Sequence, residues 1–362
     1  MVSSSLPYGV FSRTGERPRV GVLVGDHIAD LSALPLAHAA DFAEPSLNAF
    51  MSRGRQAWLD NQAELRQILS REQDLIPRTD VSLHLPFQVA DYVDFYSSEH
   101  HATNVGRIFR PDGEPLSKNW RHLPIGYHGR AGTVVVSGTP IRRPSGQRKQ
   151  GDFGPSERLD IEAEVGFVVG TPAPQGRVAT ADFAEHVFGV VLVNDWSARD
   201  IQSWETVPLG PFLGKSFATS ISPWVVPLAA LEHARVEPPP RDPEPLPYLR
   251  ETEPWGLDLE LTVRLNGTVI SRPPFRHMYW TAAQQLAHMT VNGASLRTGD
   301  LFASGTVSGP NPDQRGCLLE LTWNGEQKLK LDDGAERAFL ADGDEVVISS
   351  AELGEVSGRI VA

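Results

Sequence analysis

The sequence predicts a mainly β protein with a few helices, divided into a small N-terminal unit and a larger C-terminal unit. Its 362 residues exceed the roughly 100–200 residues of one typical domain. Several runs alternate apolar and polar residues with the two-residue period of a strand. The 32 glycines and 29 prolines supply the turns that many short strands require.

The N-terminal unit combines short strands with one helix. Three short β-type runs open the chain, at residues 10–11, 20–24 and 27–28. Apolar residues at spacings of three, four and seven then predict a helix over residues 47–70, with Ser46 as its N-cap. A further strand over residues 81–85 ends at a proline. We therefore predict a domain boundary here, which gives domains of residues 1–88 and 89–362.

The C-terminal unit is predicted to be mostly strand. Alternation predicts four strands, at residues 159–169, 257–265, 318–323 and 345–349. Asn-Gly pairs at 266–267 and 324–325 follow the second and third of these strands and are strong hairpin signals. Thr281 is a plausible N-cap for a helix over residues 281–288. The proline-rich residues 237–254 predict an excursion over the surface.

Charge and cysteine content narrow the function classes. Lys and Arg total 33 against 45 Asp and Glu, and a formal net charge of −12 disfavours nucleic-acid binding. Cys317 is the only cysteine, lies in the second predicted hairpin, and fits a reducing compartment. The longest strongly apolar run, residues 187–193, is too short to cross a bilayer. We therefore expect a soluble cytoplasmic protein that binds neither nucleic acid nor a membrane.

Four carboxylates stand out as candidate metal ligands. Glu162 and Glu164 are two residues apart on a predicted strand, so they share the face opposite its apolar residues. Asp195 follows the buried run 187–193 and Asp94 precedes a polar loop, and buried acidic side chains need a partner. Oxygen ligands without cysteines or paired histidines favour Mg²⁺, Ca²⁺ or Mn²⁺ over zinc.

Two alternatives remain open at this point. The two glutamates could lie on a solvated outer face, and the carboxylates could form salt bridges with Arg199 or Lys215. A histidine in the predicted loop after Asp94 is a natural base at neutral pH, and His100 and His101 are equally good by composition. No Gly-x-Ser-x-Gly motif occurs and the one cysteine lies in a predicted hairpin, so a serine or cysteine nucleophile is not indicated. No P-loop occurs either.

Longer motifs carry a resemblance to a known family. They are Asp94–Gly106, Leu123–Arg130, Val193–Gln202, Pro208–Phe217 and Phe302–Gly309. In this order they resemble the fumarylacetoacetase (fumarylacetoacetate hydrolase) family. The resemblance implies a small N-terminal SH3-like β-barrel and a large C-terminal mixed β-sandwich roll that dimerises.

The resemblance also implies roles for individual residues. The ligands of a divalent cation, Mg²⁺ or Ca²⁺, would be Asp94, Glu162, Glu164 and Asp195, with Lys215 and Thr219 at a second, Mg²⁺-type position. His101 would be the base oriented by Glu320, while Arg199, Gln202 and Lys215 would stabilise developing negative charge. Substrate would contact Tyr96, Arg110, Tyr127, Gln202, Thr206 and Thr306. This chain departs from the family pattern at Thr206, where the family has tyrosine, and at Ala218, where it has glycine.

The implied reaction is hydrolysis of a carbon–carbon bond in a diketo acid. The family substrate is 4-fumarylacetoacetate, which is cleaved to fumarate and acetoacetate in the last step of tyrosine and phenylalanine catabolism. Thr206 leaves room for a different diketone, so an acylpyruvate hydrolase is the alternative within enzymes. A binding protein without catalysis is the alternative of another class, and the presence of His101, Glu320, Arg199 and Lys215 disfavours it.

Overall fold

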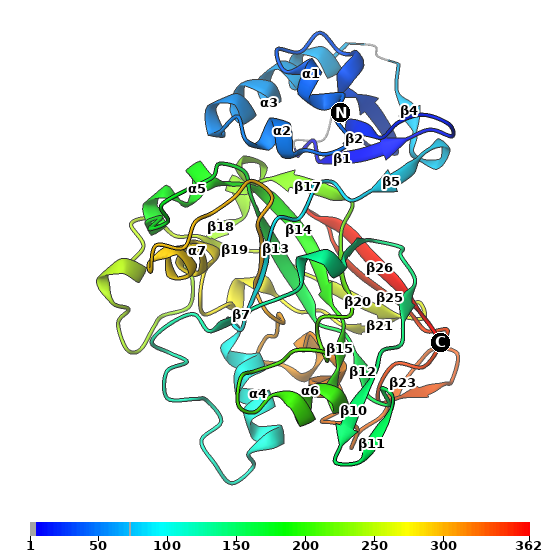
Figure 1. Ribbon diagram of the computed structural model, residues 1–362, viewed down its shortest axis with the longest axis vertical. Coiled ribbons are helices and arrows are strands. Elements are labelled where there is room, and N and C mark those ends of the chain that lie inside the picture. Colours follow the sequence, from blue (N-terminus) through cyan, green and yellow to red (C-terminus); the bar gives the residue numbers. More distant parts are fainter. Residues whose placement is uncertain (1–4, 72–73) are drawn as a thin grey trace.

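The computed structural model describes residues 5–71 and 74–362. The N-terminal segment lies at one end of the long axis, and the larger remainder contains most of the strands (Figure 1). A thirteen-stranded sheet continues from the N-terminal segment into the larger part, where β14 contacts strands of a five-stranded sheet. The prediction of a mainly β protein with few helices is confirmed.

The large sheet follows the order β4-β3-β2-β1-β17-β14-β13-β22-β6-β7, with β5 beside β1, β16 beside β14 and β8 beside β16. Its pairs are antiparallel except β6–β22 and β8–β16. Its strands are β1 (Tyr8–Ser12), β2 (Arg19–Val24), β3 (His27–Asp30), β4 (Ile76–Pro77), β5 (Ser82–His84), β6 (Tyr92–Phe95), β7 (Gly126–His128), β8 (Val134–Val136), β13 (Ala163–Val169), β14 (Val187–Asp195), β16 (Thr219–Ile221), β17 (Trp224–Pro227) and β22 (Leu301–Ala303).

The second sheet and four two-stranded ribbons complete the β structure. The second sheet has the order β21 (Thr268–Ser271), β20 (Thr262–Leu265), β25 (Glu345–Ser350), β26 (Gly354–Val361) and β9 (Ile141–Arg142). The ribbons pair β10 (Ser145–Lys149) with β11 (Asp152–Pro155), β12 (Leu159–Asp160) with β15 (Ser197–Ala198), β18 (Arg235–Val236) with β19 (Gly256–Leu257), and β23 (Leu329–Lys330) with β24 (Glu336–Arg337).

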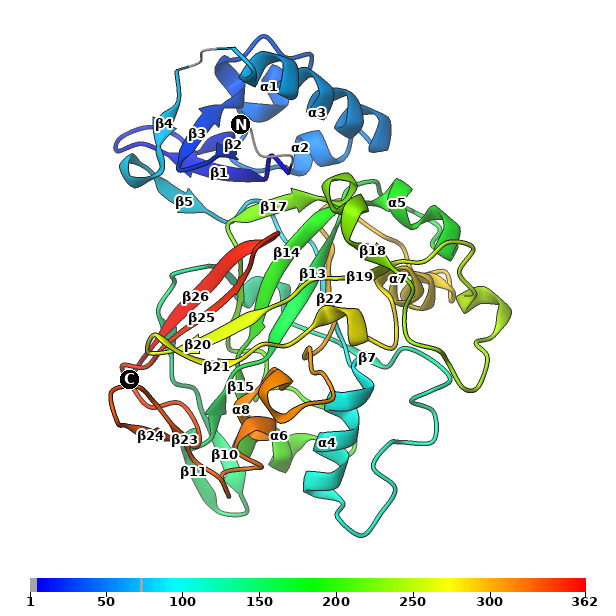
Figure 2. The same ribbon diagram turned by 180° about the vertical axis from the view of Figure 1, so that it is seen from behind.

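The helices are short apart from α3 and α4. The α-helices are α1 (Ala39–Phe42), α2 (Asn48–Met51), α3 (Arg55–Leu69), α4 (Glu99–Phe109), α5 (Phe183–His186), α6 (Arg199–Glu205), α7 (Ala282–Thr290) and α8 (Leu318–Leu321). The 3₁₀ turns are η1 (Leu31–Ala33), η2 (Arg78–Asp80), η3 (Ala131–Thr133), η4 (Thr180–Asp182), η5 (Leu228–Ala234), η6 (Pro247–Leu249), η7 (Phe275–His277) and η8 (Pro312–Gln314). Figure 2 shows α4, α6 and α8 at the end of the molecule away from the N-terminal segment.

The central strand β14 is buried on both faces. Val190 and Leu192 belong to the hydrophobic cluster shared with the five-stranded sheet. Val191 and Val193 point the other way and belong to the cluster shared with the N-terminal segment. Because successive side chains of a strand alternate between faces, a continuous apolar run is what such a doubly covered strand requires.

Aromatic side chains join the N-terminal segment to this sheet. The ring of Phe188 lies 5.6 Å from Tyr8, 6.0 Å from Phe50 and 5.3 Å from Trp58, measured between ring centroids. The strands at residues 10–11, 20–24 and 27–28 are confirmed as parts of β1, β2 and β3. The SH3-like barrel and the boundary between residues 1–88 and 89–362 stay predictions.

The single helix over residues 47–70 is wrong in detail. The chain forms α2 and α3, separated by a turn at Ser52–Gly54. Leu47 rather than Ser46 occupies the N-cap position of α2, although Ser46 Oγ accepts a hydrogen bond from the Asn48 N–H at 3.4 Å. Gly54 has a φ of 87°, a conformation that interrupts a helix. The apolar spacing within α3 is confirmed, since its apolar positions supply buried side chains to the core.

The strand over residues 318–323 is also wrong. Residues Leu318–Leu321 form the one-turn helix α8, and Cys317 is its N-cap residue rather than part of a hairpin. A short apolar run does not distinguish a helix from a strand by periodicity. The helix is stabilised by Asp160, whose carboxylate accepts hydrogen bonds from the first backbone N–H groups of α8.

Other predicted elements are confirmed with changed bounds. The run 159–169 divides into β12 and β13, and the run 257–265 divides into β19 and β20. The hairpin at 266–267 joins β20 to β21, and Thr281 caps α7 through a capping box with Gln284.

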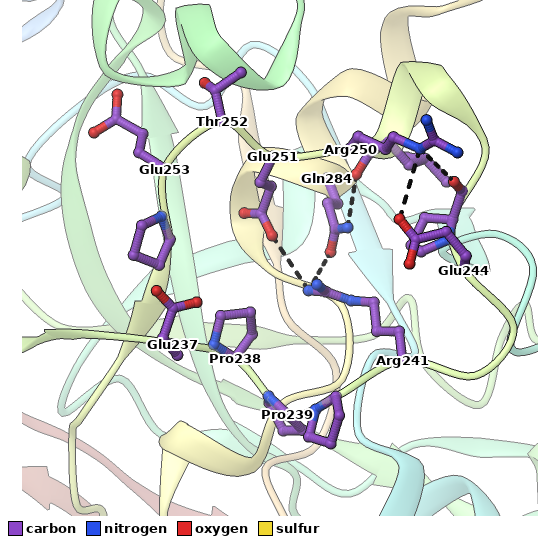
Figure 3. Close-up of a pocket in the computed structure, with 14 residues that line it drawn as sticks. Glu237, Pro238, Pro239, Arg241, Glu244, Arg250, Glu251, Thr252, Glu253 and Gln284 are labelled. Atoms are coloured by element: carbon purple, nitrogen blue, oxygen red, sulfur yellow. Dashed lines mark hydrogen bonds and ion pairs between the residues drawn. The ribbon is translucent and has the colours of Figure 1, made fainter.

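The proline-rich excursion over residues 237–254 lies at the surface, and Leu249 is its only buried residue. Arg241 joins it to α7 by donating to Gln284 Oε1 at 2.6 Å, and the ion pair of Arg241 with Glu251 lies within the excursion (Figure 3). A cavity of about 410 Å³ lies between the excursion and Gln284.

Candidate active site

Four carboxylates meet where strands of the large sheet end. Asp94 lies in β6, Glu162 just before β13, Glu164 in β13 and Asp195 at the end of β14. All four are buried, and one ligand oxygen of each lies within 4.8 Å of the others. The alternating apolar side chains of residues 161–169 pack into the hydrophobic core on one face of the strand, as alternation predicts. The two glutamates lie on the other face, which is buried rather than solvated.

Two cations neutralise part of this cluster. Lys215 Nζ lies 2.5 Å from Glu162 Oε2 and 3.0 Å from Asp195 Oδ2, and Arg199 Nη1 lies 2.7 Å from Glu162 Oε1. Burial alone would raise the pKa of Glu162, but the charges of Lys215 and Arg199 outweigh it and hold that pKa well below its usual range. The salt-bridge alternative therefore holds for part of the cluster.

Three buried oxygens of the cluster have no hydrogen-bond donor among the described residues. They are Asp94 Oδ1 and both carboxylate oxygens of Glu164. Burial, followed by the charge of neighbouring carboxylates, raises the pKa of Asp94 and of Glu164. Buried carboxylates without partners are costly, and a set of acidic oxygens with free lone pairs suits a hard divalent cation. The residues thus fit such an ion.

Hydroxyl groups orient Asp195 within the cluster. Thr219 Oγ1 donates to Asp195 Oδ1 at 3.0 Å, and the phenol of Tyr127 donates to Asp195 Oδ2 at 2.9 Å. Burial, followed by the negative charge of Asp195, raises the pKa of Tyr127, so the phenol keeps its proton and remains a donor.

A histidine and a glutamate form a second buried group. His101 Nδ1 lies 2.6 Å from Glu320 Oε2, and both side chains are buried. Burial alone would raise the pKa of Glu320, but the charge of His101 and hydrogen bonds from His101, Asn104 and Ser308 lower it to about 2. Glu320 is therefore a carboxylate, so Nδ1 of His101 keeps the proton that it donates, and when the imidazole is neutral Nε2 is left as the acceptor.

The predicted loop around His101 is a helix instead. His101 lies in the first turn of α4, whose N-cap residue Ser98 accepts a hydrogen bond from the His101 N–H. The structure also separates the two neighbouring histidines. The ring of His100 lies against His277, with 5.9 Å between centroids, whereas His101 faces Glu320.

Three groups around Glu320 were missed in the sequence. Asn104 Nδ2 donates to Oε1 at 2.8 Å, while Ser308 Oγ at 2.8 Å and Cys317 Sγ at 3.2 Å donate to Oε2. Asn104 follows His101 by three residues on one helix face, so recognising this helix would have paired them. The other two reach Glu320 from a loop and a cap, for which the sequence carries no comparable signal.

Asp160 was also missed, although it connects both halves of the site. Its Oδ1 accepts from the backbone N–H of Leu318 at 2.7 Å, and its Oδ2 accepts from that of Leu319 at 2.9 Å. The same Oδ2 accepts from Arg199 Nε at 2.8 Å. One carboxylate thus fixes the helix that carries Glu320 and the guanidinium that faces Glu162.

The loop after β22 brings a hydroxyl to the site. Gly305 has a φ of 77°, and a Cβ there would lie 2.2 Å from the carbonyl oxygen of Phe95, so a side chain is excluded. This close approach fixes the backbone at the neighbouring Thr306. The Oγ1 of Thr306 is buried and has no hydrogen-bond partner among the described residues. Arg199 Nη2, in α6, is another buried polar atom that has no hydrogen-bond partner among the residues that the structure describes.

Comparison with known protein families assigns the chain. The model described as "Fumarylacetoacetate (FAA) hydrolase C-terminal" matches residues 91–361, and the one described as "Fumarylacetoacetase N-terminal" matches residues 4–86. The chain belongs to the fumarylacetoacetase family. It is 49% identical to the fumarylacetoacetases of Bos taurus and Homo sapiens, over 95% of this chain and 90% of theirs. The resemblance noted in the sequence is thus confirmed, and the chain is a hydrolase of this family.

Solved structures share the fold of this family member. The fumarylacetoacetate hydrolase of Exiguobacterium antarcticum is 19% identical and gives a TM-score of 0.62, with 99% of this chain and 100% of that chain covered. The maleylpyruvate hydrolase of Sphingobium sp. SYK-6 in complex with manganese(II) and pyruvate is 16% identical and gives a TM-score of 0.62, with 98% and 99% covered. At these identities the likeness concerns the fold.

Most of the residues expected from the family lie in one of two groups. Asp94, Glu162, Glu164 and Asp195 form the carboxylate group, which Arg199, Lys215, Thr219 and Tyr127 contact directly and Gln202 contacts through Arg199. Tyr96, His101 and Glu320 form the other group. Arg110 is exposed and donates to the Pro115 carbonyl at 2.6 Å. Thr206 Oγ1 donates to the Gln202 carbonyl at 2.6 Å. The roles of all these residues stay predictions.

No helix within residues 5–71 and 74–362 is both long enough and apolar enough to cross a membrane.

Proposed function

We propose that this hydrolase cleaves the carbon–carbon bond of 4-fumarylacetoacetate with water, giving fumarate and acetoacetate in tyrosine and phenylalanine catabolism. The observation that carries the proposal is a buried His–Glu pair that Asp160 and Arg199 link to a cluster of partly unpaired carboxylates. The 49% identity to fumarylacetoacetases supports the choice of substrate.

A divalent cation, Mg²⁺ or Ca²⁺, is proposed for the carboxylate cluster. Asp94, Glu162, Glu164 and Asp195 would hold it, because they offer clustered acidic oxygens, several of them unpaired. When bound, such a cation supplies Lewis-acid stabilisation of the negative charge that develops on a diketone. The remaining members of the proposed set, Lys215 and Thr219, hold Asp195 by an ion pair and a hydrogen bond.

His101 is proposed as the general base. Its Nδ1–H is committed to Glu320, so Nε2 is free to take a proton from water as the water attacks the acyl carbonyl. The carbon–carbon bond then breaks, and the departing carbon takes up a proton, which His101 can return. The balance is one water consumed, with its hydroxyl on the new carboxylate and its proton on the released ketone.

Three side chains are proposed to stabilise negative charge in the transition state. Arg199 has an unpaired, buried Nη2, and its Nη1 also donates to Gln202 Oε1 at 3.2 Å. Burial opposes the charge on Lys215, but Asp195 and Glu162 raise the pKa of its ammonium above the usual range, so it stays charged. Removing one such preorganised donor typically lowers kcat by about 10²–10³.

Substrate positioning is assigned to hydroxyl and guanidinium groups. Thr306 offers a buried hydroxyl without a partner, and the ring of Tyr96 lies 5.2 Å from that of His101. Tyr127, Gln202 and Arg110 complete the proposed contacts. The hydroxyl of Thr206 is used within α6, so this position is expected to give the distal end of substrate a weaker contact than a family tyrosine.

Metal removal tests the proposed chemistry. Dialysis against a chelator should abolish turnover of fumarylacetoacetate, and Mg²⁺ or Ca²⁺ should restore it. The melting temperature should rise with added cation in the wild type, because ligand that binds only the folded state stabilises it. Asp94→Asn should lose that rise. Full activity in protein shown by elemental analysis to lack metal would overturn the metal assignment.

The alternative is a hydrolase of an acylpyruvate or another diketo acid. This alternative is supported by Thr206, which stands where the family has tyrosine. Steady-state rates on fumarylacetoacetate, fumarylpyruvate and acetylpyruvate separate the two. A kcat/KM higher for either pyruvate derivative than for fumarylacetoacetate would replace the proposed substrate.

A cytoplasmic homodimer is proposed as the working form. Large apolar side chains of the loop after α6 are exposed, with Val207 at 84%, Leu209 at 96% and Phe212 at 65% of their full exposure. Exposed apolar surface of this kind is typical of an interaction site. Sedimentation velocity should give the mass of two chains, and a single-chain mass at working concentration would contradict it.

A further inference from the structure

The segment between α6 and Lys215 forms a closed loop around one carboxylate. Glu205, the last residue of α6, accepts hydrogen bonds from three consecutive backbone N–H groups. The Phe212 and Gly214 N–H groups each donate to Oε1 at 2.8 Å, and the Leu213 N–H donates to Oε2 at 3.0 Å. Lys215 follows this set directly, so the carboxylate fixes the backbone from which Lys215 projects.

Apolar packing does not hold this loop within the described chain. Val207, Leu209, Phe212 and Leu213 all have more than half of their surface exposed. Hydrophobic burial, which orders most loops with large side chains, is therefore small within a single chain, and only the proposed dimer would add to it. Hydrogen bonds to the carboxylate take its place, and bonds to a charged acceptor are the stronger kind.

The end of the loop also packs directly on α6. A Cβ at Gly214 would lie 2.7 Å from the backbone nitrogen of Gln202, so only glycine permits this approach. The Gly214 carbonyl accepts from the Ala198 N–H at 2.8 Å. The helix that carries Arg199 and Gln202 and the turn that carries Lys215 are thus joined at three points, of which Glu205 is one.

We propose that Glu205 is a positioning residue that acts through Lys215. By holding three N–H groups, it keeps the ammonium of Lys215 between Glu162 and Asp195. The kinetic part of this inference rests on the proposed function, since Lys215 is there assigned to transition-state charge. The structural part, ordering of residues 212–215, does not depend on any substrate.

Hydrogen exchange tests the structural part. In Glu205→Ala the amides of Phe212, Leu213 and Gly214 should exchange at least about 10-fold faster than in the wild type, because their acceptor is gone. Glu205→Gln should show intermediate protection, since its amide oxygen can replace Oε1 but its amide nitrogen cannot accept at Leu213. Glu355→Gln removes an exposed charge on β26 and serves as the control. Unchanged exchange at 212–214 in Glu205→Ala would overturn the proposal.

Kinetics test the route through Lys215. Glu205→Ala should lower kcat by about 10- to 100-fold with KM changed by less than about 2-fold, as expected when transition-state stabilisation is lost. Glu205→Gln should recover part of kcat. In a Lys215→Met background the same Glu205→Ala change should cost less than about 3-fold, because residues that act as a unit are not additive. An equal loss in both backgrounds would overturn the route through Lys215.

The two experiments distinguish the failures. A wild-type protein that does not turn over fumarylacetoacetate would refute the proposed function, while exchange at residues 212–214 would still decide whether Glu205 orders the loop. If Glu205→Ala does not fold, Glu205→Gln carries both measurements, and wild-type exchange and kcat in that variant would contradict the proposal.

Discussion

The proton on Nδ1 of His101 is held by the carboxylate of Glu320, so Nε2 is the nitrogen left to accept a proton. His101→Ala should therefore lower kcat by about 10²–10⁴, the usual contribution of a general base, while the fold is kept. His100→Ala is the matched control, because its ring contacts His277 and makes no bond to Glu320. Steady-state rates of the two variants test this prediction, with circular dichroism as the check on folding. Similar losses of kcat in both variants would show that the base is misassigned.

Glu320 also ties stability to pH. Its folded-state pKa of about 2 lies below the ordinary value of 4.5, so it contributes stability that is present above about pH 4.5 and is lost as pH falls toward about 2. The contribution is on the order of 3 kcal/mol. Glu320→Gln removes it, so the wild type and the variant should converge in unfolding free energy as pH falls.

Urea unfolding at several values between about pH 6 and about pH 3 measures that convergence. Glu355→Gln, an exposed carboxylate on β26, controls for charge alone. A wild-type-to-Glu320→Gln difference that is constant over the range would contradict the assigned protonation of Glu320.

The candidate ligands were predictable one residue at a time, whereas their partners were not. Glu162, Glu164 and Asp195 stand at recognisable positions, on or just after predicted strands, so period and strand ends identify them. Asp160 and Ser308 are ordinary polar residues in the sequence. Their importance comes from contacts such as Asp160 with Leu318, which no local pattern encodes.

At the scale of elements, alternation succeeded where a strand is covered by core. The apolar run of β14 and the alternating residues of β13 were both predicted as strands, because burial alone determines their pattern. It failed at α4 and α8, whose first turns depend on a cap. Ser98 and Asp160 supply those caps, one from the preceding residue and one from 158 residues away along the chain.

The turn after β22 gives a test at this scale. Gly305→Ala should destabilise the protein by about 1–3 kcal/mol, since φ is 77° and Cβ would meet the Phe95 carbonyl. Gly132→Ala is the matched control, because nothing lies within 4 Å of a Cβ there and its φ is not in the left-handed region. Urea unfolding measures both, and equal effects would argue against a constrained turn at 305.

At the scale of the whole molecule, the N-terminal segment is part of the folded unit through Phe188. Phe188→Ala should lower the free energy of unfolding by about 3–5 kcal/mol, because it removes a buried ring that contacts Tyr8, Phe50 and Trp58. Phe153→Ala, at an exposed position on β11, should change it by less than about 0.5 kcal/mol.

Chemical denaturation followed by tryptophan fluorescence measures this difference. The wild type should unfold in one transition if the two segments depend on the shared cluster. Two resolved transitions in the wild type would contradict that dependence and would favour segments that fold independently.

The parallel pairing of β6 with β22 has a consequence for how the site forms in time. It joins Tyr92 to Leu301, and the bond between His101 and Glu320 spans 219 residues. Contacts this distant along the chain close late and slowly, because a long loop must lose its freedom before any contact repays it. During synthesis His101 and Glu320 cannot meet until Glu320 has left the ribosome, so a growing chain carries all four clustered carboxylates long before this pair can form.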